Sequence, residues 1–137
     1  MLPKLVSVPD RMAKGLGDGM MLIPTALEVD AMIRKIPRGD VSTLAQIRKR
    51  LAHWHNVDVT CPLMTGIFLR IVAEAAEEDR LLGKLDITPY WRIVGEDGKL
   101  NAKFPGGVER QAEHLREEGD AVEHGKVAIR RTAAPAA

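Results

Sequence analysis

The chain has 137 residues, 45% of them hydrophobic and 28% charged, and Lys plus Arg (20) nearly balance Asp plus Glu (19), which leaves a formal net charge of +1. These values are typical of one soluble globular domain, and they exclude a polycation that binds nucleic acid through bulk charge alone. The single cysteine, Cys61, excludes an internal disulfide and a zinc site made of several cysteines. No stretch approaches the roughly 18 apolar residues of a membrane-spanning helix, so we expect a reduced, cytoplasmic protein.

The two ends of the chain differ from its middle. Glycines alternate with other residues at Gly15, Gly17 and Gly19, where no helical period survives, so we expect a flexible N-terminal segment over residues 1–20. Alanine and proline dominate the last residues, which predicts a flexible tail over 131–137. A single domain is expected over 21–130.

Two capping boxes predict the first two helices. In each, a threonine is followed three residues later by Glu or Gln, so that both side chains bind free backbone amides: Thr25 with Glu28, and Thr43 with Gln46. The first helix should end before Pro37, and the second near residues 55–56. The apolar positions expected to face the core are Leu27, Ala31, Ile33 and Ile36 in the first helix and Leu44, Ile47 and Leu51 in the second.

A third, longer helix is expected from Pro62 to the stop signal at Gly83. Its expected core positions are Leu63, Ile67, Ile71, Ala75 and Leu82.

The second half of the domain shows strand signals around one more helix. Residues 90–94 are rich in strand formers and lead through Asp97 and Gly98 to residues 99–100, which predicts a hairpin. A fourth helix should follow residues 105–107 and end near Glu118. Residues 122–123 and 126–129 predict a last hairpin. The fold class is therefore mainly α with a small β wing, a winged helix-turn-helix.

Charge is unevenly spread along the chain. Residues 31–56 hold six basic residues and one acidic residue, a net +5, whereas residues 74–86 hold two basic and five acidic residues, a net −3. A basic surface on the first two helices would attract phosphates, although a solvated charged face explains the same pattern.

Three segments, taken in order, resemble the DNA-binding domain of the methylated-DNA–protein-cysteine methyltransferases. Residues 36–43 read Ile-Pro-Arg-Gly-Asp-Val-Ser-Thr, like the family's entry to its first DNA-facing helix. Residues 88–94 read Thr-Pro-Tyr-Trp-Arg-Ile-Val and are similar to the Pro-Cys-His-Arg-Val-Val active-site strand. Residues 97–100, 104–108 and 115–119 resemble the family's G-x-L, its aromatic-Ser-Gly-Gly-Leu loop and its terminal L-x-x-E-G helix.

The chain departs from this pattern where the family does its chemistry. Tyr90 and Trp91 stand where the family has its nucleophilic cysteine and the histidine that activates it, while Glu118 matches the relay glutamate. A phenol with a pKa near 10 and no adjacent base is a poor nucleophile, so alkyl transfer is not expected. Cys61 lies outside the motif, and we expect it to be a buried apolar residue.

The resemblance is closest to the alkyltransferase-like proteins, which lack the nucleophilic cysteine and bind alkylated guanine without repairing it. It implies a non-enzymatic protein that acts in DNA repair by flipping 6-O-alkylguanine out of double-stranded DNA. It also implies that Arg70, on the recognition helix, fills the gap left by the base. The implied DNA-binding residues are Arg38, Thr43, Arg48 and Arg70, and the implied base pocket is Tyr90, Trp91, Arg92, Phe104, Gly106 and Gly107.

Other interpretations stay open. Tyr90 and Trp91 would equally pack the wing onto the helices, and Arg70 would equally form a surface pair with Glu74. Leu44 replaces a tyrosine that contacts a DNA phosphate in many relatives. The alternative function is a winged-helix protein-interaction or regulatory module that has lost lesion recognition.

No cofactor and no metal are expected. His53 and His55 lack the carboxylate or cysteine partners of a metal site. We expect a monomer without a membrane partner, whose partners are double-stranded DNA and, where the resemblance extends so far, a repair protein.

Overall fold

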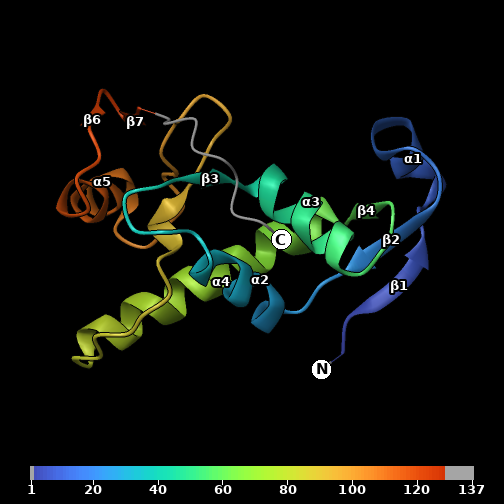
Figure 1. The fold of residues 1–137 in the computed structure, drawn as a ribbon, viewed down its shortest axis with the longest axis horizontal. Coiled ribbons are helices and arrows are strands. Elements are labelled where there is room, and N and C mark those ends of the chain that lie inside the picture. Colours follow the sequence, from blue (N-terminus) through green and yellow to red (C-terminus); the bar gives the residue numbers. More distant parts are fainter. Residues whose placement is uncertain (1, 129–137) are drawn as a thin grey trace.

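The computed structural model describes residues 2–128, which form a mainly helical protein with three small sheets. Figure 1 shows the long helix α4 (Pro62–Leu81) running beneath α2 (Ala26–Arg34) and α3 (Leu44–Trp54), with the N-terminal strands at one end and α5 (Gly107–Glu117) at the other. None of the helices in this part of the chain is long and apolar enough to cross a membrane.

The N-terminal residues form regular structure where the sequence predicted a flexible segment over 1–20. Strand β1 (Lys4–Ser7) pairs antiparallel with β2 (Met20–Ile23), and helix α1 (Asp10–Leu16) connects them. Strand β2 pairs in parallel with β4 (Val59–Thr60). Of the glycines that predicted flexibility, Gly15 lies in α1, whereas Gly17 and Gly19 form the turn after it with φ of 82° and 117°, which glycine adopts readily. The tail predicted over 131–137 lies outside the described residues.

Helices α2, α3 and α4 form the main bundle. Both predicted capping boxes are confirmed: Thr25 accepts from the Glu28 amide and Thr43 from the Gln46 amide, while the Glu28 and Gln46 side chains accept from the two threonine amides. The core positions of α3 at Ile47 and Leu51 are confirmed. The predicted core positions Ile33 and Ile36 are confirmed, whereas Leu27 and Ala31 are exposed and Val29 and Met32 are buried in their place.

Helix α4 also buries a different stripe from the one predicted. Its core residues are Leu69, Val72, Ala73 and Ala76, whereas Leu63, Ile67 and Ile71 are exposed. The helix is apolar on two sides, so the period of its apolar residues could not tell the core side from the outer side.

The predicted hairpin at residues 90–100 is wrong. Tyr90–Arg92 form the 3-10 turn η1, and only Ile93–Val94 (β5) are extended, pairing in parallel with β3 (Ser42–Thr43). Strand-forming residue types here reflect burial, because Tyr90, Trp91 and Ile93 all belong to the core. The turn at Asp97 and Gly98 does form, and Gly95 N donates to Lys99 O at 2.8 Å.

The C-terminal elements agree with the sequence. Helix α5 follows the predicted glycines, and β6 (Val122–Glu123) pairs antiparallel with β7 (Lys126–Val127). His124 and Gly125 both have positive φ (53° and 73°), as a two-residue type I′ turn requires.

Candidate nucleic-acid interface

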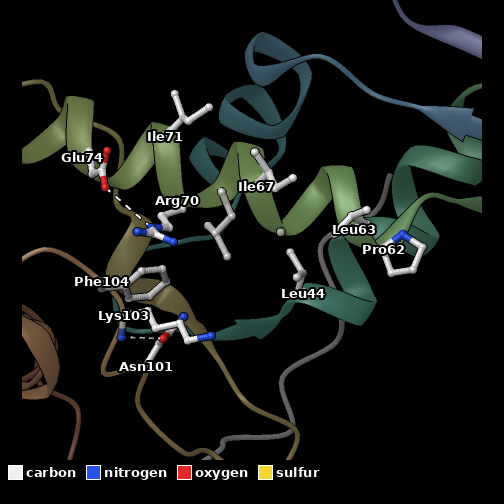
Figure 2. A pocket seen from close by; sticks show the side chains of 12 residues that line it. Leu44, Pro62, Leu63, Ile67, Arg70, Ile71, Glu74, Asn101, Lys103 and Phe104 are labelled. Carbon is white, nitrogen blue, oxygen red and sulfur yellow. Dashed lines mark hydrogen bonds and ion pairs between the residues drawn. The ribbon is translucent and has the colours of Figure 1, made fainter.

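An open groove of about 620 Å³ runs along the outer face of α4. The 101–104 loop forms its other wall, and the start of α3 closes one end. Figure 2 shows Arg70 extending from α4 toward Phe104, with Leu44 and Leu63 farther along the groove. The lining residues are Leu44, Pro62, Leu63, Gly66, Ile67, Leu69, Arg70, Ile71, Glu74, Asn101, Lys103 and Phe104.

The α4 wall combines apolar side chains with one cation. Leu63, Ile67 and Ile71 are 65%, 44% and 48% exposed, so an apolar stripe faces solvent. The Arg70 guanidinium lies 3.7 Å from Glu74 Oε1, and these side chains are 63% and 56% exposed. An exposed pair of this kind contributes well under about 1 kcal/mol, so Arg70 is free to leave it for a ligand.

The opposite wall is held in shape by Gln111, which is fully buried in α5. Its side-chain oxygen accepts from the Asn101 amide at 2.7 Å, and its nitrogen donates to the carbonyls of Trp91 (3.1 Å) and Ile93 (2.9 Å). Asn101 Oδ1 in turn accepts from the Lys103 amide at 2.9 Å. Gln111 thus fixes the loop that carries Phe104, a role for which the sequence held no signal beyond an amide in an amphipathic helix.

A buried polar cluster lies behind Phe104. The Tyr90 ring meets Phe104 edge-on at 5.1 Å, and its hydroxyl donates to Glu77 Oε2 at 2.7 Å. Glu77 also binds Arg80 Nε (2.7 Å) and His114 Nε2 (2.9 Å). Burial raises the pKa of Glu77, but these three hydrogen bonds outweigh burial and leave that pKa below its ordinary value. Burial and the Glu77 carboxylate both raise the pKa of Tyr90, so the phenol stays protonated at neutral pH.

A second, largely buried ion pair joins the turn η1 to the end of α5. Arg92 binds both Glu118 oxygens, at 2.9 and 2.6 Å, and donates to the Ile36 carbonyl at 2.7 Å. Arg38 lies 3.7 Å from the same carboxylate. Burial raises the pKa of Glu118, but the hydrogen bonds and charge of Arg92, together with Trp91 and the charge of Arg38, outweigh burial and leave that pKa below its ordinary value. The Glu118 carboxylate therefore forms ion pairs with two arginines, Arg92 and Arg38.

A comparison with protein families fits this arrangement of helix, loop and buried turn. The family described as "6-O-methylguanine DNA methyltransferase, DNA binding domain" matches residues 24–120. The chain belongs to this family. A search of curated proteins found no match.

The family match covers α2 to α5 and starts after β2, so most of the N-terminal sheet lies outside it. Within the match, the resemblance stated from residues 36–43, 88–94 and 97–119 is confirmed. The family's domain binds DNA, and the groove lies entirely within the matched part.

The structure separates the predicted DNA-binding residues. Arg70 lines the groove, whereas Arg48 lines a recess on the other side of α3. Thr43 caps α3, and Arg38 donates to the Glu117 carbonyl at 2.9 Å. The basic residues of the 31–56 segment therefore do not lie together on one face of the protein.

The predicted base-pocket residues are also divided. Of the six, Phe104 lines the groove. Tyr90 is fully buried, and Trp91 stacks on His114 at 3.9 Å, so both pack the turn onto the helices instead of forming an open wall. Arg92 is engaged by Glu118, and Gly106 and Gly107, with φ of 75° and 68°, shape the start of α5.

The acidic end of α4 is largely paired within the molecule. Glu77 binds Arg80 and Asp79 lies 3.2 Å from Lys84 Nζ, while Asp86 lies 3.1 Å from Arg34. These pairs reduce the negative field that this helix end would direct at a ligand in the groove.

Residues considered for metal or thiol chemistry lie elsewhere. His55 binds Glu28, and among residues 2–128 no group of three or more His, Cys, Asp or Glu side chains could hold a metal ion. Cys61 is buried with Val8 and Met21 in a second apolar cluster, as expected of a structural cysteine.

Proposed function

We propose that this protein is a non-enzymatic DNA-binding protein that holds a duplex along the α4 groove and recognises alkylated guanine there. The observation that carries this proposal is the meeting of Arg70, the exposed apolar stripe of α4 and Phe104 in one groove of a DNA-binding family domain. The proposal assigns the protein to damage recognition, with any repair step carried out by a partner.

Arg70 is the residue proposed to enter the base stack. It stands near the middle of the exposed α4 face, and among residues 2–128 it is held only by a long ion pair to Glu74. A planar guanidinium stacks on bases and donates hydrogen bonds at once, so it can take the place of a displaced base. Ile67, about one turn before Arg70, and Ile71, the residue that follows it, would contact the sugar edges, since apolar side chains commonly wedge into a minor groove.

The base would enter the groove beside Phe104. Stacking of a base on an aromatic ring contributes about 1–3 kcal/mol, and a volume of about 620 Å³ lies within the usual range of ligand pockets. Phe104 is the aromatic residue that lines the groove, but only 4% of it is exposed, so stacking of a base on its ring requires the 101–104 loop to shift. Tyr90 packs against Phe104 from the core side. Base recognition by Tyr90 and Trp91 themselves would require both rings to leave the core.

Alkyl transfer has no nucleophile in this arrangement. The Tyr90 phenol is buried, its pKa is raised and its hydroxyl proton is engaged by Glu77. The thiol of Cys61 belongs to a separate apolar cluster beside the N-terminal sheet. Binding without covalent chemistry is the function that these residues support.

A second candidate function follows from the same stripe. Three exposed aliphatic side chains on one helix, Leu63, Ile67 and Ile71, are also typical of a surface that binds a protein. In this alternative the chain is an interaction or regulatory module, and the acidic Glu74 on the groove would disfavour DNA.

Binding to matched duplexes separates the two functions. Affinity is measured at one stated salt concentration for a plain duplex and for the same duplex with a single 6-O-methylguanine, using wild type, Arg70→Ala and Phe104→Leu. Damage recognition predicts tighter binding to the modified duplex, with the preference lost in both variants. Equal affinity of the wild type for both duplexes, in the millimolar range, would favour the interaction module.

A further inference from the structure

A second recess, of about 370 Å³, lies between the outer face of α3 and the segment 57–60. Its cationic and imidazole side chains, Arg48, Lys49 and His53, come from successive turns of α3, and Asp58 is the acidic residue among those that line it. Lys49 and His53 are exposed. This concentration of N–H donors on one short helix face is suited to an anion.

Reciprocal hydrogen bonds fix the recess. Thr60 Oγ1 donates to the Arg48 carbonyl at 2.7 Å, and Arg48 Nε donates to the Thr60 carbonyl at 3.3 Å. Asp58 Oδ2 accepts from the Met20 amide at 2.8 Å, which reduces its repulsion of an anion. The guanidinium of Arg48 is therefore held in place beside β4 before any ligand arrives.

The N-terminal sheet explains why this segment stays against α3. Strand β4 pairs with β2, and β2 pairs with β1, so residues 4–23 carry the segment that closes the recess. These residues precede the family match at 24–120. The residues that line the recess all lie within the match, so the N-terminal strands support the recess from outside the family domain without lining it.

The recess lies next to the groove. Leu44 lines the groove while its neighbour Ala45 lines the recess. Likewise, Pro62 at the start of α4 lines the groove, and Thr60, two residues earlier, lines the recess. The other basic residues of the 31–56 segment lie outside the recess: Arg34 pairs with Asp30 and Asp86, Lys35 lies over the Trp54 ring, Arg38 pairs with Glu118, and Arg50 is buried.

We propose that Arg48, Lys49 and His53 bind a backbone phosphate of the duplex whose bases are read in the α4 groove. This inference rests on the proposed DNA-binding function and extends it, because it assigns the N-terminal sheet a part in the interface. Phosphate contacts of this kind fix position and add affinity that does not depend on sequence.

The test measures how the affinity for a plain duplex depends on salt concentration in the wild type and in two variants. The double variant Lys49→Gln, His53→Gln removes two exposed side chains and leaves the Arg48–Thr60 bonds intact, and circular dichroism with thermal melting checks its fold. Loss of one phosphate contact should lower the slope of log K against log salt by about 1 and the affinity about five- to tenfold near 0.1 M salt. Lys84→Gln, an exposed cation at the far end of α4, should leave both unchanged.

Each other outcome overturns the inference in a distinguishable way. If Arg70→Ala weakens binding and the double variant matches wild type, the recess makes no phosphate contact while the proposed function stands. If wild type binds no duplex, both proposals are wrong. If inorganic phosphate shifts the amide resonances of Lys49 and His53 and duplex DNA does not, the recess is a site for free anions and not for the DNA backbone.

Discussion

The hydroxyl of Tyr90 donates a hydrogen bond to the carboxylate of Glu77 at 2.7 Å, and both groups are buried beneath the groove wall. This bond places a phenol where the family's reactive thiol is expected and commits its proton to a structural partner. At this position Tyr90 is part of the core that packs against Phe104.

Replacing Tyr90 with Phe should destabilise the protein by about 1–3 kcal/mol, because Glu77 loses one of three donors in a buried site. Urea denaturation monitored by circular dichroism measures the change in unfolding free energy. An unchanged midpoint would show that the hydroxyl contributes nothing. Unfolding of Tyr90→Ala would not test the hydrogen bond, because this variant also loses the packing of the ring.

The same pair predicts a loss of stability at high pH. The pKa of Tyr90 is raised on folding from an unfolded value near 10, so the neutral phenol is favoured in the folded state. Its contribution is fully present below about pH 10 and is lost as the pH rises above that value. The difference in unfolding free energy between wild type and Tyr90→Phe should shrink from pH 8 to pH 11. A difference that stays constant over this pH range would contradict the raised pKa of Tyr90 in the folded protein.

Glu118→Gln should cost about 3 kcal/mol, since it leaves the buried Arg92 guanidinium without its carboxylate. The lowered pKa of Glu118 means that this stability is present above about pH 4.3 and is lost as the pH falls below it. Chemical denaturation at pH 7 and pH 3.5 measures both effects. Glu113→Gln, which removes an exposed carboxylate 3.8 Å from Arg110, is the matched control and should change stability by less than about 0.5 kcal/mol.

Incubation with a duplex that carries labelled 6-O-methylguanine should leave the intact mass of the protein unchanged. Tyr90→Cys should also remain unlabelled, because the position is fully buried and does not line the groove. A methyl adduct on the wild type would show that the protein is an alkyltransferase. An adduct on Tyr90→Cys alone would show that the site is more open than the packing of Tyr90 implies.

The sequence could predict the elements whose signals are local. Capping at Thr25 and Thr43, the proline start of α4 and the His124–Gly125 turn each depend on a few adjacent residues, and all are present in the structure. The family motifs likewise depend on short segments in a fixed order, and the family match confirms them.

What could not be predicted depends on tertiary contacts. Helix α4 has apolar residues on two sides, and only packing against α2 decides that Leu69 and Val72 face inward while Ile67 and Ile71 face the groove. Pairing of β2 with β4 joins residues some forty positions apart, so glycine-rich residues near Gly17 looked unstructured in isolation.

The candidate site shows the same division. Arg70 and Phe104 could be selected from the motifs, and the structure brings them to one groove. The partners that bury Tyr90, above all Glu77 from α4 and His114 from α5, carried no motif that could have linked them.

The measurement that tests the central claim most directly is the affinity of the wild type and of Arg70→Ala for duplex DNA at one fixed salt concentration. Lys84→Ala is the matched control, since its side chain is 61% exposed, close to the 63% of Arg70, and it too pairs with a carboxylate. DNA binding through the α4 groove predicts that Arg70→Ala loses at least about tenfold in affinity, or about 1.4 kcal/mol, while Lys84→Ala binds like wild type. Equal affinity of all three proteins would contradict the claim that this groove binds DNA.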